Sequence, residues 1–271
     1  MRLADKVVIV TGSATGIGRG IALGAAAEGA RVVVHGLEPD LVAEVVAEIG
    51  PSSGGTARAV GHVGELAAGD CPQALVSLAV ARFGRLDCLV NNAAAVVTGD
   101  IHSTDAELFE RVMRVNALVP LLLIQAALPH LRATRGNVLN IGSVNAWCGE
   151  SNLLPYAMSK GALMTLTRNL GDVLFREEGV RVNQINPGWV LTENESRRKQ
   201  SQGFETDWPA RLPREFAPSG RLFTPAEIAA VAITVLADES GPVSAQVCDL
   251  EQYPFIGRNP LKSISPRTPT P

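Results

Sequence analysis

Tyr156 and Lys160 are spaced for acid–base chemistry. Four positions apart, they fall on one face of a helix, one turn from each other. A neighbouring ammonium favours tyrosinate and so lowers the pKa of the phenol from its usual value of about 10. Such a tyrosine can exchange a proton with an alcohol oxygen. A surface tyrosine above a lysine has the same spacing, so the pair needs support from other residues.

A glycine-rich segment, T-G-S-A-T-G-I-G at residues 11–18, joins a predicted strand to a predicted helix. Glycine permits a tight turn and lets a phosphate approach the backbone, while the helix N-terminus that follows offers free N–H groups. A plain chain reversal also uses glycine. The position after the first strand and before the first helix is the one that dinucleotide binding requires. We therefore predict that this segment binds the diphosphate of a dinucleotide.

Polar or glycine motifs follow several of the predicted strands at the point where each strand ends. Ser143 is one of them, because it comes just after the predicted strand 137–141. The other motifs follow the predicted strands 7–10, 86–90 and 180–185, and they are Gly12, Asn91-Asn92-Ala93 and Asn186-Pro187-Gly188. The carboxyl ends of parallel strands meet at one edge of a sheet, where doubly wound folds bind their ligands. Turn-forming residues are needed in any such loop, which leaves a purely structural interpretation open.

The elements that position these residues alternate between apolar strands and longer helical segments. Strict alternation predicts an α/β fold, a single-domain doubly wound parallel sheet of the Rossmann type with helices on both faces. We expect further strands at 31–34, 56–60 and 245–250, and helices at 16–28, 40–49, 71–83, 105–131, 154–176 and 224–236. Thr224 and Glu227 form a predicted capping box at the start of the last helix. One catalytic domain covers residues 1–250, including a mobile substrate lid at about 193–222, and a tail covers 251–271.

Composition excludes several classes of function. The chain has 271 residues with 46% hydrophobic residues and a net charge of −3, enough for one large core and too acidic for a nucleic-acid partner. No apolar run long enough to span a membrane is predicted, and we expect a cytoplasmic protein without a membrane partner. The four cysteines are scattered without metal-binding spacing, so no metal site is predicted.

The ordered set of motifs resembles the short-chain dehydrogenase/reductase family over roughly residues 5 to 250. The matching motifs are T-G-x-x-x-G-x-G at 11–18, N-N-A at 91–93, Ser143, Y-x-x-x-K at 156–160 and P-G-x-x-x-T at 187–192. The resemblance implies that Tyr156 is the acid/base and that Ser143 hydrogen-bonds the reacting oxygen. It also implies that Lys160 holds the nicotinamide ribose and lowers the pKa of Tyr156, and that Asn116 holds a proton-relay water.

The coenzyme implied by the resemblance is NAD or NADP. The residues predicted to bind it are Gly12, Ser13, Thr15, Gly16, Ile17, Gly18, Gly36, Leu37, His62, Val63, Asn92, Ala93, Tyr156, Lys160, Pro187, Gly188, Val190 and Thr192. NADP-preferring members place a cation near the end of the second strand or in the glycine motif, where this chain has Leu37 and Thr15. Because a 2′-phosphate needs compensating charge, NAD is favoured.

The predicted substrate is a secondary alcohol or ketone, with a sugar, a polyol or a related hydroxylated compound favoured. The residues predicted to contact it are Ser143, Asn145, Trp147, Glu150, Tyr156 and Trp189. Two alternatives stay open: a reductase of 3-oxoacyl thioesters or bulky apolar ketones, and a catalytically silent nucleotide-binding or scaffold protein. The resemblance also implies a homotetramer or homodimer, and no partner other than the small-molecule substrate is predicted.

Overall fold

The core of the fold is a seven-stranded parallel sheet. The computed structural model describes residues 1–51 and 55–253, and the strands lie in the order β3-β2-β1-β4-β5-β6-β7. Their bounds are β1 Val7–Val10, β2 Arg31–Gly36, β3 Ala59–Val63, β4 Cys88–Asn91, β5 Asn137–Ile141, β6 Arg181–Pro187 and β7 Val247–Leu250. This order places the switch in winding direction between β1 and β4, and it confirms the predicted Rossmann-type sheet.

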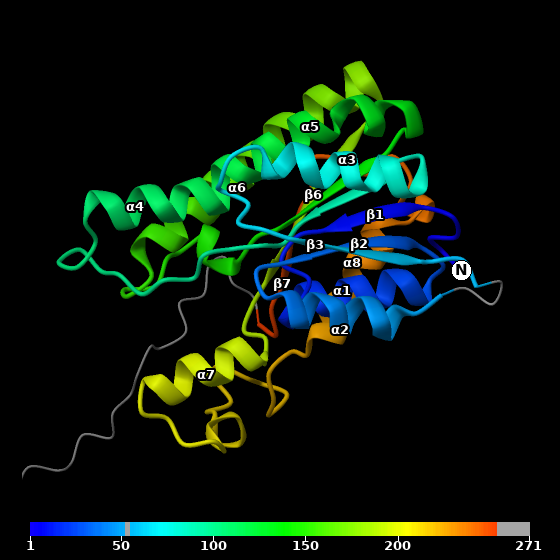
Figure 1. The fold of residues 1–271 in the computed structure, drawn as a ribbon. Coiled ribbons are helices and arrows are strands. Elements are labelled where there is room, and N and C mark those ends of the chain that lie inside the picture. Colours follow the sequence, from blue (N-terminus) through cyan, green and yellow to red (C-terminus); the bar gives the residue numbers. More distant parts are fainter. Residues whose placement is uncertain (52–54, 254–271) are drawn as a thin grey trace, which may run out of the picture.

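Helices cover both faces of the sheet (Figure 1). Their bounds are α1 Gly16–Ala27, α2 Pro39–Ile49, α3 Cys71–Phe83, α4 Ala106–Met113, α5 Val119–Thr134, α6 Leu154–Glu178, α7 Glu193–Ser201 and α8 Pro225–Leu236. On β1, Val8 and Val10 face α1, α2 and α8, whereas Val7 and Ile9 face α3, α5 and α6. Because a strand buried on both faces is apolar at every position, β1 has no alternating pattern.

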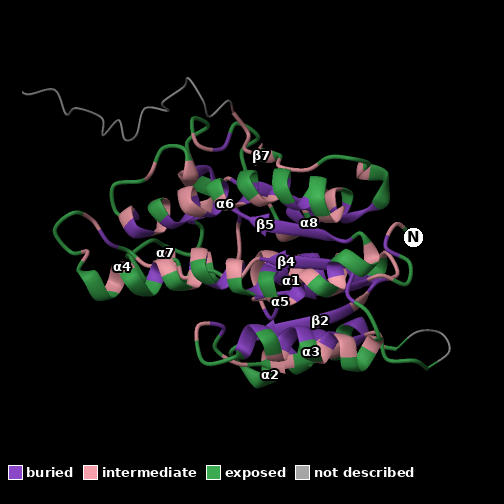
Figure 2. Cartoon of the chain, turned by 90° about the horizontal axis from the view of Figure 1, so that it is seen from above, coloured by how far each residue is buried: buried purple, intermediate pink, exposed green. Residues whose placement is uncertain are grey.

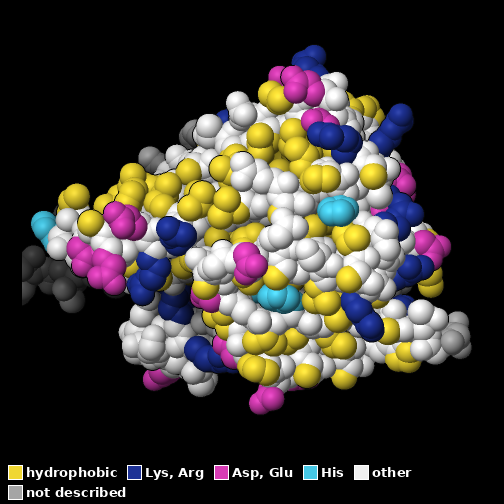
Figure 3. All heavy atoms as spheres, turned by 45° about the horizontal axis from the view of Figure 1, so that its top comes forward, with side chains coloured by type: hydrophobic (Ala, Val, Ile, Leu, Met, Phe, Trp, Pro, Cys, Tyr) yellow, Lys and Arg dark blue, Asp and Glu magenta, His cyan; other side chains and the backbone are white. Residues whose placement is uncertain are grey.

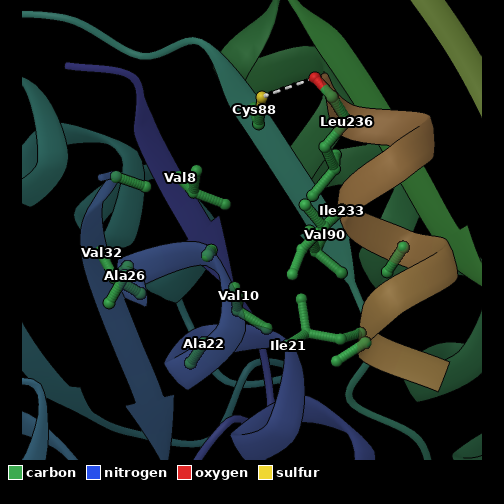
Figure 4. Packing of buried hydrophobic residues seen from close by; sticks show 14 of the residues in the cluster. Val8, Val10, Ile21, Ala22, Ala26, Val32, Cys88, Val90, Ile233 and Leu236 are labelled. Carbon is green, nitrogen blue, oxygen red and sulfur yellow. Dashed lines mark hydrogen bonds between the residues drawn. The ribbon is translucent and has the colours of Figure 1, made fainter. Parts of the chain in front are cut away.

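Two helices on one face, α1 and α8, pack very closely. A Cβ atom on Gly24 would lie 2.7 Å from Cδ1 of Ile233, and one on Gly20 would lie 2.9 Å from the carbonyl oxygen of Pro225. Figure 4 shows Ile21 and Ile233 in one apolar cluster with Val10 and Val90 of the sheet. The buried strands form the centre of the molecule in Figure 2. The small residues of α1 therefore let two helices and the sheet share one continuous apolar core.

Two predicted segments differ from the structure. The strand predicted at 56–60 lies at Ala59–Val63, three residues further on, because the pairing of β3 with β2 decides the position rather than local composition. The lid segment, for which no helix is predicted, contains α7 and a 3₁₀ turn at Trp208–Arg211. Thr192 caps α7 by accepting a hydrogen bond from the Glu195 N–H at 3.1 Å. Residues 254–271 of the predicted tail lie outside the described residues.

A long helical run joins α4 and α5 through a π-helical turn at Arg114–Leu118. The combined run, Ala106–Thr134, is long and apolar enough to cross a membrane by length and composition, whereas the sequence predicts a helix at 105–131 and no run of that kind. Leu123, Ile124 and Leu131 of this run are buried in the core against the sheet. Core helices pass the same test of length and composition, so the run carries little weight as a membrane span.

The capping box of α8 gives a test of the fold. The Thr224 side chain accepts from the Glu227 N–H at 3.3 Å, and the Glu227 carboxylate accepts from the Thr224 N–H at 2.9 Å. Thr224→Ala should lower the free energy of unfolding by about 1 kcal/mol, because the Glu227 N–H loses its acceptor, the Thr224 hydroxyl. Urea denaturation measures the loss, and Thr224→Ser, which keeps the hydroxyl, should retain most of the stability. Equal stability of the alanine variant would contradict the assignment.

Candidate active site

The carboxyl ends of the strands open into one large cavity. Its volume is about 1700 Å³, larger than the roughly 300–1,000 Å³ of a typical small-ligand pocket, so it has room for a dinucleotide and a second molecule. The predicted site residues that line it are Gly12, Thr15, Gly16, Ile17, Gly36, Leu37, Asn92, Ala93, Ser143, Asn145, Glu150, Tyr156, Lys160, Pro187, Gly188, Trp189, Val190 and Thr192. The predicted residues outside its wall are Ser13, Gly18, His62, Val63, Asn116 and Trp147.

The glycine turn after β1 fits the diphosphate of a dinucleotide. Gly12 and Gly16 have φ values of 61° and 56°, which side-chain-bearing residues rarely adopt. Thr15, the N-cap of α1, makes no capping hydrogen bond with its side chain, and the first turn of α1 has no acidic residue. The backbone N–H groups in the first turn of α1 therefore have no side-chain cap from Thr15 and can bind an anion. Gly18 lets α1 pack against the glycine turn, since a Cβ there would lie 2.3 Å from the Gly12 carbonyl oxygen.

Asn92, at the end of β4, ties that strand to the glycine turn. Its Nδ2 donates to the carbonyl oxygens of Thr11 and Gly12 at 2.8 and 3.0 Å. The Thr11 hydroxyl in turn accepts from the N–H groups of Asn92 and Ala93 at 3.0 and 3.1 Å. The side chains of the N-N-A motif and of Thr11 therefore hold the floor of the cavity in place, while the backbone of Ala93 lies at its surface.

A ladder of buried polar side chains crosses the sheet beneath Ser143, and we call it the polar ladder. Its successive donor-to-acceptor distances are 2.8 Å or less up to Asp249, and its members are Asn91, Asn140, Thr167, Gln184, Asn186 and Asp249. Asn186 Oδ1 also accepts from the Ser143 N–H at 3.1 Å. Trp147 donates its indole N–H to Asp249 at 2.9 Å, and Arg168 lies over its ring. Trp147 is therefore part of the support for Ser143 and not of the cavity wall.

Ser143, Tyr156 and Lys160 converge at the cavity. Lys160 is 2% exposed, its Nζ donates to the Ile141 carbonyl oxygen at 2.7 Å, and it lies 5.6 Å from the centre of the Tyr156 ring. Burial lowers the pKa of Lys160 to about 8. The end of β5 thus fixes Ser143 and the ammonium, and the first turn of α6 brings Tyr156 to both.

The predicted lowering of the Tyr156 pKa by Lys160 is wrong for the protein without coenzyme. Burial is the largest influence and raises the pKa of Tyr156 above its ordinary value. A hydrogen bond with Ser143 and the positive charge of Arg198 act in the opposite direction, and they are the smaller influences. The ammonium of Lys160 points to the backbone of Ile141, so sequence spacing placed the two side chains correctly and misjudged their electrostatics.

Asn116 sits in the π-helical turn and is 1% exposed. Its Oδ1 accepts from the Ala95 N–H at 2.7 Å, and its Nδ2 donates to the Ala95 carbonyl oxygen and to Ser159 Oγ at 3.0 and 2.9 Å. The Ser159 hydroxyl donates to the carbonyl oxygen of Tyr156 at 2.7 Å. Asn116 thereby links the loop after β4 to the turn of α6 that carries Tyr156. The role predicted for it with a relay water stays a prediction.

The end of β2 shapes the far side of the cavity. A Cβ atom on Gly36 would lie 2.7 Å from Cβ of Ala14, so only glycine lets the glycine turn pack against this strand. Leu37 is 55% exposed and lies at the wall together with Glu38. His62 stacks on His35 with 6.0 Å between the ring centres, and Val63 faces solvent. Neither His62 nor Val63 reaches the wall.

The lid contains Glu195, Arg198 and Trp208, and the sequence did not predict the contacts that these residues make. Glu195 of α7 accepts from the indole N–H of Trp189 at 2.8 Å and pairs with Arg198 through two bonds of 2.9 and 3.0 Å. Trp189 stacks on Trp208 with ring centres 5.3 Å apart. Arg198 is thereby held at the cavity wall near Tyr156. The i,i+3 spacing of Glu195 and Arg198 was the available signal, but it becomes visible only if the segment is helical.

Charged side chains surround the open end of the cavity. Lys and Arg side chains gather on the left of Figure 3, between α4 and the lid. Arg111 and Arg114 of the long helical run line the cavity. Glu251, which follows β7, reaches the wall beside Gly188, and burial raises its pKa. The sequence did not predict Glu251 as a site residue because the chain after β7 has no local pattern that aims it back at the cavity.

Comparisons with known proteins agree with this geometry. A family model described as short chain dehydrogenase matches residues 6–203. L-fucose dehydrogenase of Bos taurus is 36% identical over 86% of this chain and 83% of its own length. Galactitol 2-dehydrogenase of Agrobacterium fabrum is 31% identical over 93% and 98%, and 2-(S)-hydroxypropyl-CoM dehydrogenase 3 of Xanthobacter autotrophicus is 34% identical over 90% and 94%. The chain therefore belongs to the short chain dehydrogenase family and is an NAD(P)-dependent oxidoreductase of alcohol groups.

Proposed function

We propose that the protein is an NAD-dependent dehydrogenase of a secondary alcohol in a polyhydroxylated compound such as a sugar or polyol. The observation that carries the proposal is the meeting of Ser143, Tyr156 and Lys160 at a cavity that begins at the glycine turn. A nicotinamide coenzyme bound there supplies the hydride-transfer chemistry. The chain's own residues bind and orient the two reactants and manage the proton.

Tyr156 takes the proton from the alcohol oxygen in the oxidising direction and returns it in the reducing direction. Ser143 donates a hydrogen bond to the same oxygen and stabilises the negative charge that develops on it. Burial lowers the pKa of Lys160 to about 8, so at pH 7 the side chain is still mainly an ammonium, and its charge favours the tyrosinate when Tyr156 loses its proton. Arg198, held over the site by Glu195, adds a second positive charge in the same sense.

Free polar groups at the cavity wall support a hydroxylated substrate. Asn145, Glu150 and Asn152 line the cavity, and their side chains have no hydrogen-bond partner within the described part of the chain. Trp189 lines the same cavity. Sugars and polyols combine hydroxyl edges with apolar faces, and two of the relatives are named for L-fucose and galactitol. The charged lid makes an acyl thioester or bulky apolar ketone a poorer match.

The preference for NAD rests on charge. At the end of β2 and after β3 the wall carries the carboxylates of Glu38 and Glu65, and within residues 1–51 and 55–253 these two segments bring no Lys or Arg to it. Carboxylates can accept hydrogen bonds from ribose hydroxyls and repel a 2′-phosphate.

We also propose a dimer or tetramer. Leu118, Leu122, Met158, Val173 and Phe175 are exposed hydrophobic side chains on the long helical run and on α6. An exposed apolar surface of this kind is typical of a subunit interface. Met158→Glu should shift the assembly to smaller species in sedimentation experiments, because a buried unpaired charge is costly at an interface. A monomeric wild-type protein at micromolar concentration would overturn this proposal.

Removing the Tyr156 hydroxyl tests the proposed chemistry. Tyr156→Phe should reduce kcat by roughly 10²- to 10⁴-fold, because no other group takes the proton. The affinity for NAD⁺, measured by calorimetry, should remain within about twofold, since the change leaves the glycine turn intact. Turnover of L-fucose, galactitol and other polyols is followed by nicotinamide absorbance. Retained turnover in the variant would remove Tyr156 from the mechanism.

Replacing Leu37 tests the coenzyme preference. The wild-type protein should have a higher kcat/KM with NAD⁺ than with NADP⁺, and Leu37→Arg should improve NADP⁺ use by roughly tenfold, because a guanidinium pairs with the 2′-phosphate. Leu37→Gln has similar length without the charge and should leave the ratio unchanged. A wild-type preference for NADP⁺ would show the charge argument to be wrong.

A further inference from the structure

His35, the penultimate residue of β2, is joined to the glycine turn by its side chain. Its Nδ1 lies 3.1 Å from the backbone N of Gly12, and its Nε2 lies 2.9 Å from the carbonyl oxygen of Gly64. The residue is 2% exposed. The imidazole therefore bridges the turn that begins the cavity to the loop that follows β3.

These two partners determine the protonation state of the ring. A backbone N–H can only donate and a carbonyl oxygen can only accept, so Nδ1 must be the acceptor from Gly12 and Nε2–H the donor to Gly64. Only the neutral ring with its proton on Nε2 satisfies both. The protonated ring would direct Nδ1–H at the Gly12 N–H, two donors facing each other in a buried place.

The backbone around His35 holds the same turn. The Ser13 N–H donates to the His35 carbonyl oxygen at 2.7 Å, and the His35 N–H donates to Ser13 Oγ at 3.0 Å. The Ser13 hydroxyl donates to the Val10 carbonyl oxygen at 2.7 Å. Gly12 itself has no side chain and a φ of 61°, so the bond from its N–H to His35 is the side-chain contact that restrains its amide.

We propose that His35 is a positioning residue for the coenzyme: its neutral ring holds the glycine turn in the conformation that receives the diphosphate, and its protonation releases the turn. The inference rests on the proposed coenzyme site. His35 reaches the cavity wall but acts through Gly12, so it belongs with the positioning residues. Coenzyme affinity should then fall in acid, at pH values where the catalytic groups have not changed.

The surroundings of His35 set the direction of the pH dependence. His62 of β3 stacks on it, Glu65 follows β3, and Cys71 at the start of α3 faces the pair. Burial lowers the pKa of His35 below its ordinary 6.5, the Gly64 carbonyl opposes this, and His62 and Glu65 contribute less and in opposite directions. Because the turn-holding form is the unprotonated one, affinity is fully present above about 6.5 and is lost as the pH falls through the lowered pKa.

The cluster of His35, His62 and Cys71 brings its ligand atoms within 4.8 Å of one another, a geometry that suggests a metal ion. A metal on Nε2 of His35 would displace the bond to Gly64 and would leave a neutral ring with its proton on Nδ1, facing the Gly12 N–H. The Cys71 thiol also has its pKa raised by burial, which disfavours the thiolate that metals prefer. Positioning of the turn accounts for the cluster better than metal binding does.

Two amide variants separate the two nitrogens of His35. In His35→Asn the side-chain oxygen takes the place of Nδ1 and accepts from Gly12 without ever titrating. In His35→Gln the amide nitrogen takes the place of Nε2 and leaves Gly12 without its acceptor. The dissociation constant of NAD⁺ is measured by calorimetry between pH 5 and 8 for wild type and both variants. His62 is present in all three proteins, so its own titration cancels in the comparison.

We expect wild-type affinity to fall below pH 6.5, His35→Asn to bind as wild type at pH 8 without the fall below pH 6.5, and His35→Gln to bind roughly tenfold more weakly at pH 8. A His35→Asn profile as steep as that of wild type, or unchanged affinity in His35→Gln, overturns the proposal. If wild type binds no coenzyme at any pH, the proposed function fails, and ¹⁵N resonances of His35 then decide separately: the Nε2–H tautomer at pH 7 supports the bridge, and the Nδ1–H tautomer overturns it.

Discussion

The polar ladder is the constraint on which the active site depends. Its five uncharged polar side chains and one carboxylate lie buried or half-buried, and buried polar groups are stable only with partners. The bonds of the ladder run from β4 to β5, to α6, along β6 and to β7, so they favour the observed register of these strands. Asn186, in the middle of this ladder, also holds the amide of Ser143. The proposed catalytic serine is therefore placed by the same bonds that align the sheet.

The two halves of the cavity are stabilised by different physical effects. At the coenzyme half, backbone groups of the glycine turn are tied by Asn92, Thr11 and His35 through short, directed hydrogen bonds. At the substrate half, burial has the largest effect: it raises the pKa of Tyr156 and lowers that of Lys160, so it favours the neutral form of both groups. Arg198 of the lid adds a positive charge that acts to lower the pKa of Tyr156. The hydrogen-bonded coenzyme half and the buried, reactive substrate half thus share one sheet edge.

Local signals predicted the elements whose residues specify them, and tertiary contacts decided the rest. The apolar strand β1 and the Thr224–Glu227 capping box could be predicted from the sequence because their causes lie within a few residues. The position of β3 could not, since pairing with β2 decides it. The joint clustering of Ser143 and Tyr156 followed from strand ends meeting at one edge, whereas the electrostatics of Tyr156 depended on burial that no spacing reveals. The role of His35 was missed because its side-chain partners are backbone groups distant in sequence. The Glu195–Arg198 pair was missed because α7, which carries both residues, has no apolar face that would predict a helix.

Asp249 ends the polar ladder from the last strand of the sheet, and this has a consequence for biosynthesis. During translation the residues before β7 leave the ribosome first, and until β7 docks, the indole of Trp147 and the amide of Asn186 have no acceptor. At that stage Asn186 can accept the hydrogen bond from the Ser143 N–H, but Asn186 itself lacks its bond to Asp249. A nascent chain can assemble the coenzyme half early, but the support of Ser143 is complete only after β7 has left the ribosome and docked.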